Sequence, residues 1–459
     1  MRTICRHAIL AFAAIVIAAP AYGKALPSNV LLGENGAVIA RTLTNGRTCP
    51  KIAIDGNKKR MSLRVPPETL PLRPTQSAPK YSKPSVFPVS VCETVVPDAA
   101  RYVSVDGQSL PIPPHQINRI VVIGDTGCRL KASDKAYQAC NDPSRYPFAE
   151  IAAHAAAWKP DIVIHVGDYL YRENPCPKYY RGCEGSPWGY GWDSWQADFF
   201  APGKILLHSA PFIFVRGNHE DCIRAGQGWW RFLDPHPFVQ GRDCNDPRQD
   251  VANDYSRPFR VPLGGGAQVV VLDLAFAPYK ALASSDPRSA QLDDAYGMLD
   301  KFAKDASFTF VATHKPILGF ATDSSGQTLF PGNQAIQHAF AAYNPMLLPR
   351  GVIVLLAGHV HLWEQVSFST PYPTQFVAGF SGTEEEPVPL AAILPANASH
   401  APGVVVKRFS SWSDGFGYMT LERQGSNHWL ATVWDRHGVP VNRCQIRGRR
   451  SRCARSYIW

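Results

Sequence analysis

Apolar runs of strand length alternate with helical segments from about residue 117 onward. The spacing of apolar positions predicts helices over 148–158, 194–200, 291–305 and 333–343, with Pro147 placed to start the first. Strands are predicted at RIVVIGD (119–125), DIVIHVGD (161–168), PFIFVRGNHE (211–220), AQVVVLDL (267–274), FTFVATHKP (308–316) and VIVLLAGHVH (352–361). Because these strands are apolar throughout, both faces of their sheet must be covered. The pattern therefore predicts an α/β layered domain.

The segments on either side of this domain have different patterns. Residues 24–115 are rich in proline, and VSVCETVVP and RYVSVDGQSLPIPP read as short strands, which predicts a small β-rich N-terminal element. After about residue 365, GYMTLERQ and HWLATVWDRHG are predicted antiparallel strands that close the far side of the sheet. The expected division is a signal segment (1–23), the N-terminal element (24–115), the α/β domain (116–440) and a basic tail (441–459).

The first residues have the pattern of an export signal. Arg2 and Arg6 precede the apolar run AILAFAAIVIAA, and the small residues Ala21 and Gly23 fit a peptidase site. The run is too short to span a membrane, and no later stretch is long enough. The protein is therefore expected to be exported, as a periplasmic or secreted protein.

Cysteine usage agrees with export. Of the 11 cysteines, Cys5 leaves with the signal, and an even number remains for an oxidising compartment. No CxxC occurs, which argues against a zinc knuckle or a thioredoxin-type site. The sequence does not fix the pairing. Near neighbours are favoured, which gives Cys128–Cys140, Cys176–Cys183, Cys222–Cys244 and Cys444–Cys453, with Cys49–Cys92 by elimination.

The formal net charge of +10 lies largely in the C-terminal tail NRCQIRGRRSRCARSYIW. One interpretation is a solvated face on a disulfide loop. The alternative is contact with anionic envelope material such as lipid or polyphosphate. No stable nucleic-acid partner is expected. The arginines of the tail are Arg443, Arg447, Arg449, Arg450, Arg452 and Arg455.

Five of the predicted strands end in polar residues of the types that bind metals. These are Asp125 in GDTG, Asp168 in GDYLY, Asn218 and His219 in GNHE, His314 in VATH, and His359 and His361 in GHVH. Open α/β sheets bind ligands beyond the carboxyl ends of their strands, so these side chains can converge. Donors of this kind without cysteine suit hard or borderline metals. They are too many for one ion, whereas two ions about 3.5–4 Å apart that share a carboxylate would use them all.

A glycine precedes Asp125, Asp168, Asn218 and His359. A turn at a strand end can need a positive φ or a close backbone approach to an ion, and glycine permits both.

The ordered set GDTG, GDYLY, GNHE, VATH and GHVH resembles the calcineurin-like metallophosphoesterases, most of all their purple acid phosphatase branch. The resemblance covers roughly residues 119–365 and implies a layered metallophosphoesterase-type β-sandwich flanked by helices. Many relatives begin with Asp-x-His, but Gly127 stands at that histidine position. Tyr171 is then the candidate replacement ligand, like the tyrosinate on ferric iron in the purple enzymes. The alternative is that Tyr171 is an aromatic residue that packs over the site.

The resemblance also implies two ligand sets. A first, ferric ion would take Asp125, Tyr171, His361 and a shared Asp168. A second, divalent ion of iron, zinc or manganese would take Asp168, Asn218, His314 and His359. His219 would hold the phosphate or protonate the leaving oxygen, and Glu220 is expected to orient His219.

The expected function is that of an exported phosphoesterase that hydrolyses phosphate monoesters by attack of a metal-bound hydroxide. Its expected catalytic residues are Asp168 and His219. A second hypothesis keeps the metals but makes the substrate a diester, such as a cyclic nucleotide, nucleic acid or phospholipid headgroup. A third is a non-catalytic anion-binding envelope protein on the same scaffold. The segment KPILGFATDSSG lacks the substrate-binding histidines frequent in purple acid phosphatases, which leaves Lys315 or Arg224 to supply positive charge.

Overall fold

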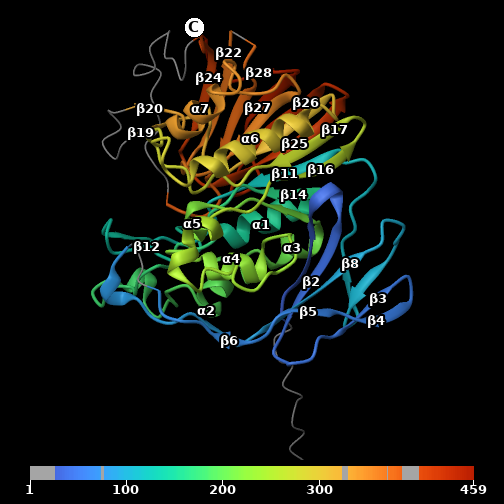
Figure 1. Ribbon diagram of the computed structural model, residues 1–459, viewed down its shortest axis with the longest axis vertical. Helices are drawn as coiled ribbons and strands as arrows, with labels where there is room; N and C mark the ends of the chain where they lie inside the picture. Colours follow the sequence, from blue (N-terminus) through green and yellow to red (C-terminus); the bar gives the residue numbers. More distant parts are fainter. Residues whose placement is uncertain (1–25, 74–76, 323–328, 370, 385–402, 459) are drawn as a thin grey trace, which may run out of the picture.

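Two large sheets packed face to face form the centre of the molecule (Figure 1). The computed structural model describes residues 26–73, 77–322, 329–369, 371–384 and 403–458; the predicted export signal, 1–23, lies outside them. The first sheet has the strand order β28 (Arg450–Cys453), β27 (Pro440–Arg447), β26 (His428–Asp435), β25 (Gly417–Gly425), β11 (Arg119–Ile123), β14 (Ile162–His165), β15 (Phe212–Phe214), β1 (Ser28–Leu32), β2 (Val38–Thr44), β8 (Ser90–Val96) and β5 (Ser62–Val65).

The second sheet has eight strands. Their order is β16 (Phe259–Gly264), β17 (Ala267–Val271), β18 (Phe308–Ala312), β21 (Val352–Ala357), β23 (Thr374–Ala378), β22 (Trp363–Phe368), β24 (Val406–Trp412) and β29 (Tyr457–Ile458). The strands that precede the predicted ligands are parallel: β11, β14 and β15 in the first sheet, and β18 and β21 in the second. Their carboxyl ends can therefore meet at one edge of the two sheets.

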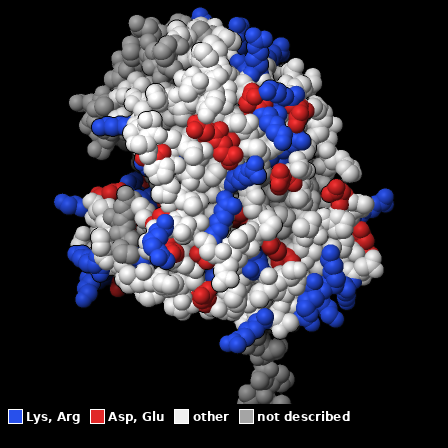
Figure 2. Space-filling model, in the orientation of Figure 1, with Lys and Arg blue, Asp and Glu red and all other residues white. Residues whose placement is uncertain are grey.

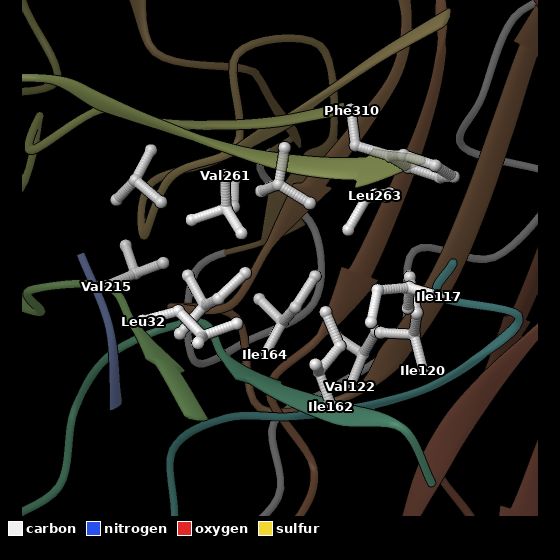
Figure 3. Close-up of a cluster of buried hydrophobic side chains, with 14 of the residues drawn as sticks. Leu32, Ile117, Ile120, Val122, Ile162, Ile164, Val215, Val261, Leu263 and Phe310 are labelled. Atoms are coloured by element: carbon white, nitrogen blue, oxygen red, sulfur yellow. The ribbon is translucent and has the colours of Figure 1, made fainter. Parts of the chain in front are cut away.

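Alternate residues of β11 explain why the strand is apolar on both sides. Ile120 and Val122 face the second sheet, whereas Val121 and Ile123 pack under helices on the outer face. Figure 3 shows the layer between the sheets, which is filled by branched side chains from both. Leu32, Ile117, Ile120, Val122, Ile162, Ile164 and Val215 come from the first sheet or its connections, and Val261, Leu263 and Phe310 come from the second.

Helices cover the outer faces of both sheets. On the first sheet lie α1 (Phe148–Ala157), α2 (Trp192–Trp195), α3 (Lys204–Ser209) and α4 (Gly226–Phe232). On the second lie α6 (Ser289–Ala303) and α7 (Gln334–Ala341), while α5 (Asp250–Asn253) is a single turn. The buried residues of α1 are spaced for one helical face: Phe148, Ile151, Ala152 and Ala155. The predicted β-sandwich flanked by helices is confirmed.

The N-terminal element is β-rich, as predicted, but it is built into the large sheet. Strand β1 pairs parallel with β15, and β2, β8 and β5 extend the sheet beyond it. A separate sheet holds β10 (Gln108–Leu110), β9 (Val103–Val105), β3 (Lys51–Ile54) and β4 (Asn57–Arg60). Three further pairs are β12 (Leu130–Lys131) with β13 (Ala136–Tyr137), β19 (Phe320–Thr322) with β20 (Leu329–Pro331), and β6 (Glu68–Thr69) with β7 (Val86–Phe87).

All five predicted disulfides are confirmed. The bonded pairs are Cys49–Cys92, Cys128–Cys140, Cys176–Cys183, Cys222–Cys244 and Cys444–Cys453. The last pair closes the hairpin of β27 and β28, so this part of the basic tail belongs to the first sheet, whereas β29 joins the second. Within the described ranges, the structure contains no helix with the length and apolar character needed to cross a bilayer.

Candidate metal centre

The loops that follow five strands bring the predicted ligands together. Asp125 follows β11, Asp168 and Tyr171 follow β14, and Asn218 follows β15 in the first sheet. His314 follows β18, and His359 and His361 follow β21, in the second. Asp125, Asp168, Tyr171 and His314 are at most 1% exposed. Buried carboxylates and imidazoles need partners of opposite charge or a metal ion, which makes this cluster a candidate site.

The Tyr171 hydroxyl is the centre of a first group of four residues. It lies 2.9 Å from Asp125 Oδ1, 2.7 Å from Asp168 Oδ2 and 2.9 Å from His361 Nε2. His361 Nε2 is also 3.4 Å from Asp125 Oδ1. The other ring nitrogen, His361 Nδ1, lies 3.0 Å from the Glu384 carbonyl oxygen, which orients the ring. The hydroxyl of the phenol therefore points into the cluster.

A second group gathers around His314. Its Nε2 lies 3.0 Å from Asn218 Oδ1 and 3.2 Å from Asp168 Oδ2, while its Nδ1 is 2.8 Å from the Val166 carbonyl oxygen. One ligand atom from each of Asp168, His314 and His359 lies within 4.8 Å of the other two. Asp168, Asn218, His314 and His359 are the second ligand set that the resemblance implies.

Asp168 belongs to both groups through one oxygen atom. Its Oδ2 contacts Tyr171 in the first group and His314 in the second, whereas its Oδ1 accepts the backbone N–H of His219 at 2.9 Å. The donor set thus divides into two quartets of oxygen and nitrogen atoms that share a carboxylate. This arrangement fits two metal ions rather than one.

The backbone at the site adopts conformations that side chains rarely allow. Asp125, Asp168 and His359 have φ values of 55°, 58° and 73°. Left-handed non-glycine residues are uncommon and collect at functional sites. Of the glycines before the ligands, only Gly167 has a positive φ, at 104°. The others serve close approach, since a Cβ on Gly217 would lie 2.0 Å from Asp168 Oδ1.

The close contacts around Gly127 explain why no histidine occupies position 127. A Cβ there would lie 2.7 Å from the backbone nitrogen of Tyr171 and 2.9 Å from the Tyr169 carbonyl oxygen. The chain that carries Tyr171 fills the space that a side chain at position 127 would need. The tyrosine and the glycine therefore belong to one local arrangement.

Burial and the two carboxylates of the cluster favour a bound cation. Burial, together with Asp125 and Asp168, raises the pKa of Tyr171 well above its ordinary value, so a phenolate there requires a cation beside it. Burial opposes charge on His314 as well, yet Asp168 raises the pKa of His314 to about 9. Histidine ligands are neutral, so a metal ion would displace this proton.

His219 contacts a carboxylate that the motifs did not reveal. Its Nδ1 lies 3.1 Å from Glu173 Oε1, and its Nε2 lies 4.0 Å from Asp168 Oδ2. Glu173 is 1% exposed and also accepts the Tyr190 hydroxyl at 3.0 Å. Burial and the nearby Arg224 lower the pKa of His219 to about 4. Glu173 stands five residues after Asp168, so its place beside the GDYLY motif was the available signal.

The prediction that Glu220 orients His219 is wrong. The Glu220 carboxylate accepts the backbone N–H groups of Asp168, Tyr169, Leu170 and Gly217 at 2.9–3.2 Å. A carboxylate that accepts several N–H groups fixes the loop that carries them. Glu220 therefore holds the loop of Asp168 in place, and the carboxylate nearest the His219 ring is that of Glu173.

Three further residues lie next to the ligands. Arg224 donates to the Asn218 carbonyl oxygen at 3.3 Å, and the buried Lys315 donates to the Ala277 carbonyl oxygen at 2.7 Å. Tyr279 was not predicted, and its hydroxyl lies 2.8 Å from His359 Nε2. No local sequence pattern marks Tyr279, because it reaches His359 from a loop after another strand.

Comparisons with known proteins identify the family and the fold of the chain. The family model described as Calcineurin-like phosphoesterase matches residues 118–362, which is more than half of the chain. No curated protein matches the chain in sequence. A purple acid phosphatase from yellow lupin (Lupinus luteus) seeds has a similar fold, with a TM-score of 0.55 and 14% identity over 92% of this chain and 74% of that one. A structure of PhoD gives a TM-score of 0.51 and 13% identity over 96% and 94%.

Proposed function

The chain belongs to the calcineurin-like phosphoesterase family, and on this basis we propose that it is an exported hydrolase of phosphate monoesters with two metal ions at the cluster around Asp168. Family membership makes it a metal-dependent phosphoesterase that acts on phosphate esters. The monoester substrate, the identity of the metals, the roles of single residues and the export are parts of the proposal.

The observation that carries the proposal is the division of the donors into two quartets with Asp168 Oδ2 between them. The first ion would be held by Asp125, Asp168, Tyr171 and His361, and the second by Asp168, Asn218, His314 and His359. We assign ferric iron to the first set because a phenolate is a hard ligand in a site with two carboxylates. The second set, with two imidazoles and an amide oxygen, suits divalent iron, zinc or manganese.

Two cations at this site would activate a water molecule for attack and neutralise charge on the phosphoryl oxygens. The chain supplies the remaining functions. His219, whose ring faces Asp168 from beside the ligand Asn218, would hold the phosphate or protonate the leaving oxygen. Glu173 would position His219 through the contact at Nδ1. Asn218 and His219 are adjacent residues of one turn, so the backbone would fix the proposed phosphate-binding residue relative to the metal ligand.

Two features support export. The first residues have the pattern of a signal, and the five disulfides suit an oxidising compartment.

The N-terminal and C-terminal boundaries of the catalytic domain, 116 and 440, are part of the same proposal. A non-catalytic anion-binding protein would have no need for a complete donor set, so the third hypothesis has no support from the geometry.

A pair of chromogenic substrates tests the proposal. The purified protein should hydrolyse p-nitrophenyl phosphate faster than bis-p-nitrophenyl phosphate, and removal of its metals by a chelator should abolish both activities. Turnover of the bis-ester alone would replace the monoester proposal with the phosphodiesterase hypothesis. No turnover of either ester by the metal-loaded protein would contradict an enzymatic function on these substrates.

A further inference from the structure

Four arginines line one pocket at the end of the molecule away from the N-terminal element. The pocket has a volume of about 580 Å³ and is formed by Arg408 of β24, by Arg447 of β27, and by Arg450 and Arg452 of β28, with Gln445 and Ser451 between them. Figure 2 shows Lys and Arg side chains gathered at the end where Figure 1 labels β28. The lining contains no acidic side chain.

The positive charge of this pocket is not neutralised by the protein. The sequence has no aspartate or glutamate after Asp435. Within the described ranges, the structure shows no ion pair or side-chain hydrogen bond from any of the four arginines, and the Nε of Arg408 is buried without a hydrogen-bond partner. A guanidinium without a protein partner keeps its N–H groups available to an anion in the pocket that it lines.

The strand register brings like charges together. Arg447 lies directly opposite Arg450 in the hairpin, a cross-strand arrangement that is unfavourable for two cations. The disulfide between Cys444 and Cys453 locks this register, so the two arginines cannot separate by slipping. A multiply charged anion between them would convert the repulsion into attraction.

We infer that this pocket binds a ligand with two or more phosphate groups, such as a condensed phosphate chain. Guanidinium groups bind phosphate oxygens in a planar, bidentate manner, and four of them match more than one phosphate. The concave shape suits a small polyanion that enters the pocket. A membrane surface would instead need cations that project outward beside apolar groups, and the pocket lining has no apolar side chain. The inference does not depend on the reaction at the metal centre.

Titration calorimetry with inorganic tripolyphosphate tests the inference on the metal-loaded protein. The double variant Arg447→Gln/Arg450→Gln should weaken binding at least 30-fold, because two charge-assisted contacts are lost. The control Arg443→Gln lies on the same exposed face of β27 but outside the pocket, and it should bind like the wild type. All three proteins share the metal centre, so tripolyphosphate bound there contributes equally to each.

Three results would overturn the inference. The first is equal tripolyphosphate affinity in the wild type and the double variant. The second is equal weakening in the Arg443→Gln control, which would indicate only long-range attraction. The third is binding to phosphatidylglycerol vesicles that depends on Arg447 and Arg450 while tripolyphosphate binding does not, which would indicate a membrane contact. Hydrolysis of p-nitrophenyl phosphate should stay within twofold of wild type. If the double variant does not fold, the single change Arg450→Gln at the exposed start of β28 replaces it, with an expected weakening of at least fivefold.

Discussion

Replacement of Gly217 by alanine should damage the metal centre through a single methyl group. Gly217 has φ −100° and ψ 168°, an extended conformation that alanine adopts without strain. Its new Cβ, however, would lie 2.0 Å from Asp168 Oδ1 and 2.2 Å from the Asp168 backbone nitrogen, where ordinary contact begins at 3.4 Å. The loop that carries the shared carboxylate must therefore move by more than about 1 Å.

The size of this displacement sets the expected loss. A misplacement of about 1 Å at a reacting centre can cost about 10²-fold in rate, and an overpacked buried site costs about 1–3 kcal/mol of stability. We expect Gly217→Ala to lower kcat/KM for p-nitrophenyl phosphate about 100-fold or more. The metal content per chain should fall as well, because the same carboxylate belongs to both quartets.

A matched control separates this effect from the loss of a glycine in general. Gly297 lies in α6, where a Cβ would meet no neighbouring group within 4 Å, so Gly297→Ala should keep full activity and gain up to about 1 kcal/mol of stability. Steady-state kinetics, elemental analysis and denaturant unfolding of both variants give the comparison. If Gly217→Ala retains two metals and full kcat/KM, the inferred position of the Asp168 loop is wrong.

Three further changes probe other parts of the structure. Tyr171→Phe should abolish a visible iron-tyrosinate absorption band of the purified protein, and an unaltered spectrum would remove Tyr171 from the ligand set. Glu173→Gln, which removes the charge beside His219, should slow hydrolysis of alkyl phosphates about 10–100-fold but p-nitrophenyl phosphate less than threefold, because only the poor leaving group needs a proton donor; equal losses for both substrates would contradict a positioning role. Burial raises the pKa of Glu364 to about 8, so the folded state keeps a proton that the unfolded state releases above about pH 4.5, and stability falls as the pH rises through this window. Glu364→Gln should remove up to about 4 kcal/mol of the stability difference between pH 5 and pH 8 in denaturant unfolding, and an unchanged pH dependence would show that Glu364 does not titrate this way.

The strands and the convergence of the ligands could be predicted because both follow from local patterns. An apolar run such as 119–123 must be buried on both sides, and parallel strands deliver the residues after them to one edge. The pattern does not tell whether a second sheet or a layer of helices covers a given face. The sandwich was expected only from the resemblance.

Long-range pairings could not be predicted from the sequence. Strand β1 joins the first sheet through a parallel pairing of Leu31 with Phe212, residues that no local periodicity connects. The contact of Glu173 with His219 and that of Tyr279 with His359 likewise depend on how loops meet in space. The glycines before the ligands were expected to allow a positive φ or a close approach, and the structure shows a close approach at all four, with a positive φ at Gly167 as well.

Elemental analysis of the purified wild-type protein beside Asp168→Asn decides whether one carboxylate joins two metal ions. If Asp168 Oδ2 serves both quartets, the wild type should contain two metal ions per chain, and the variant should lose both ions together with turnover of p-nitrophenyl phosphate. A variant that keeps two ions per chain and full activity, or a wild type that binds a single ion, would contradict a shared binuclear centre.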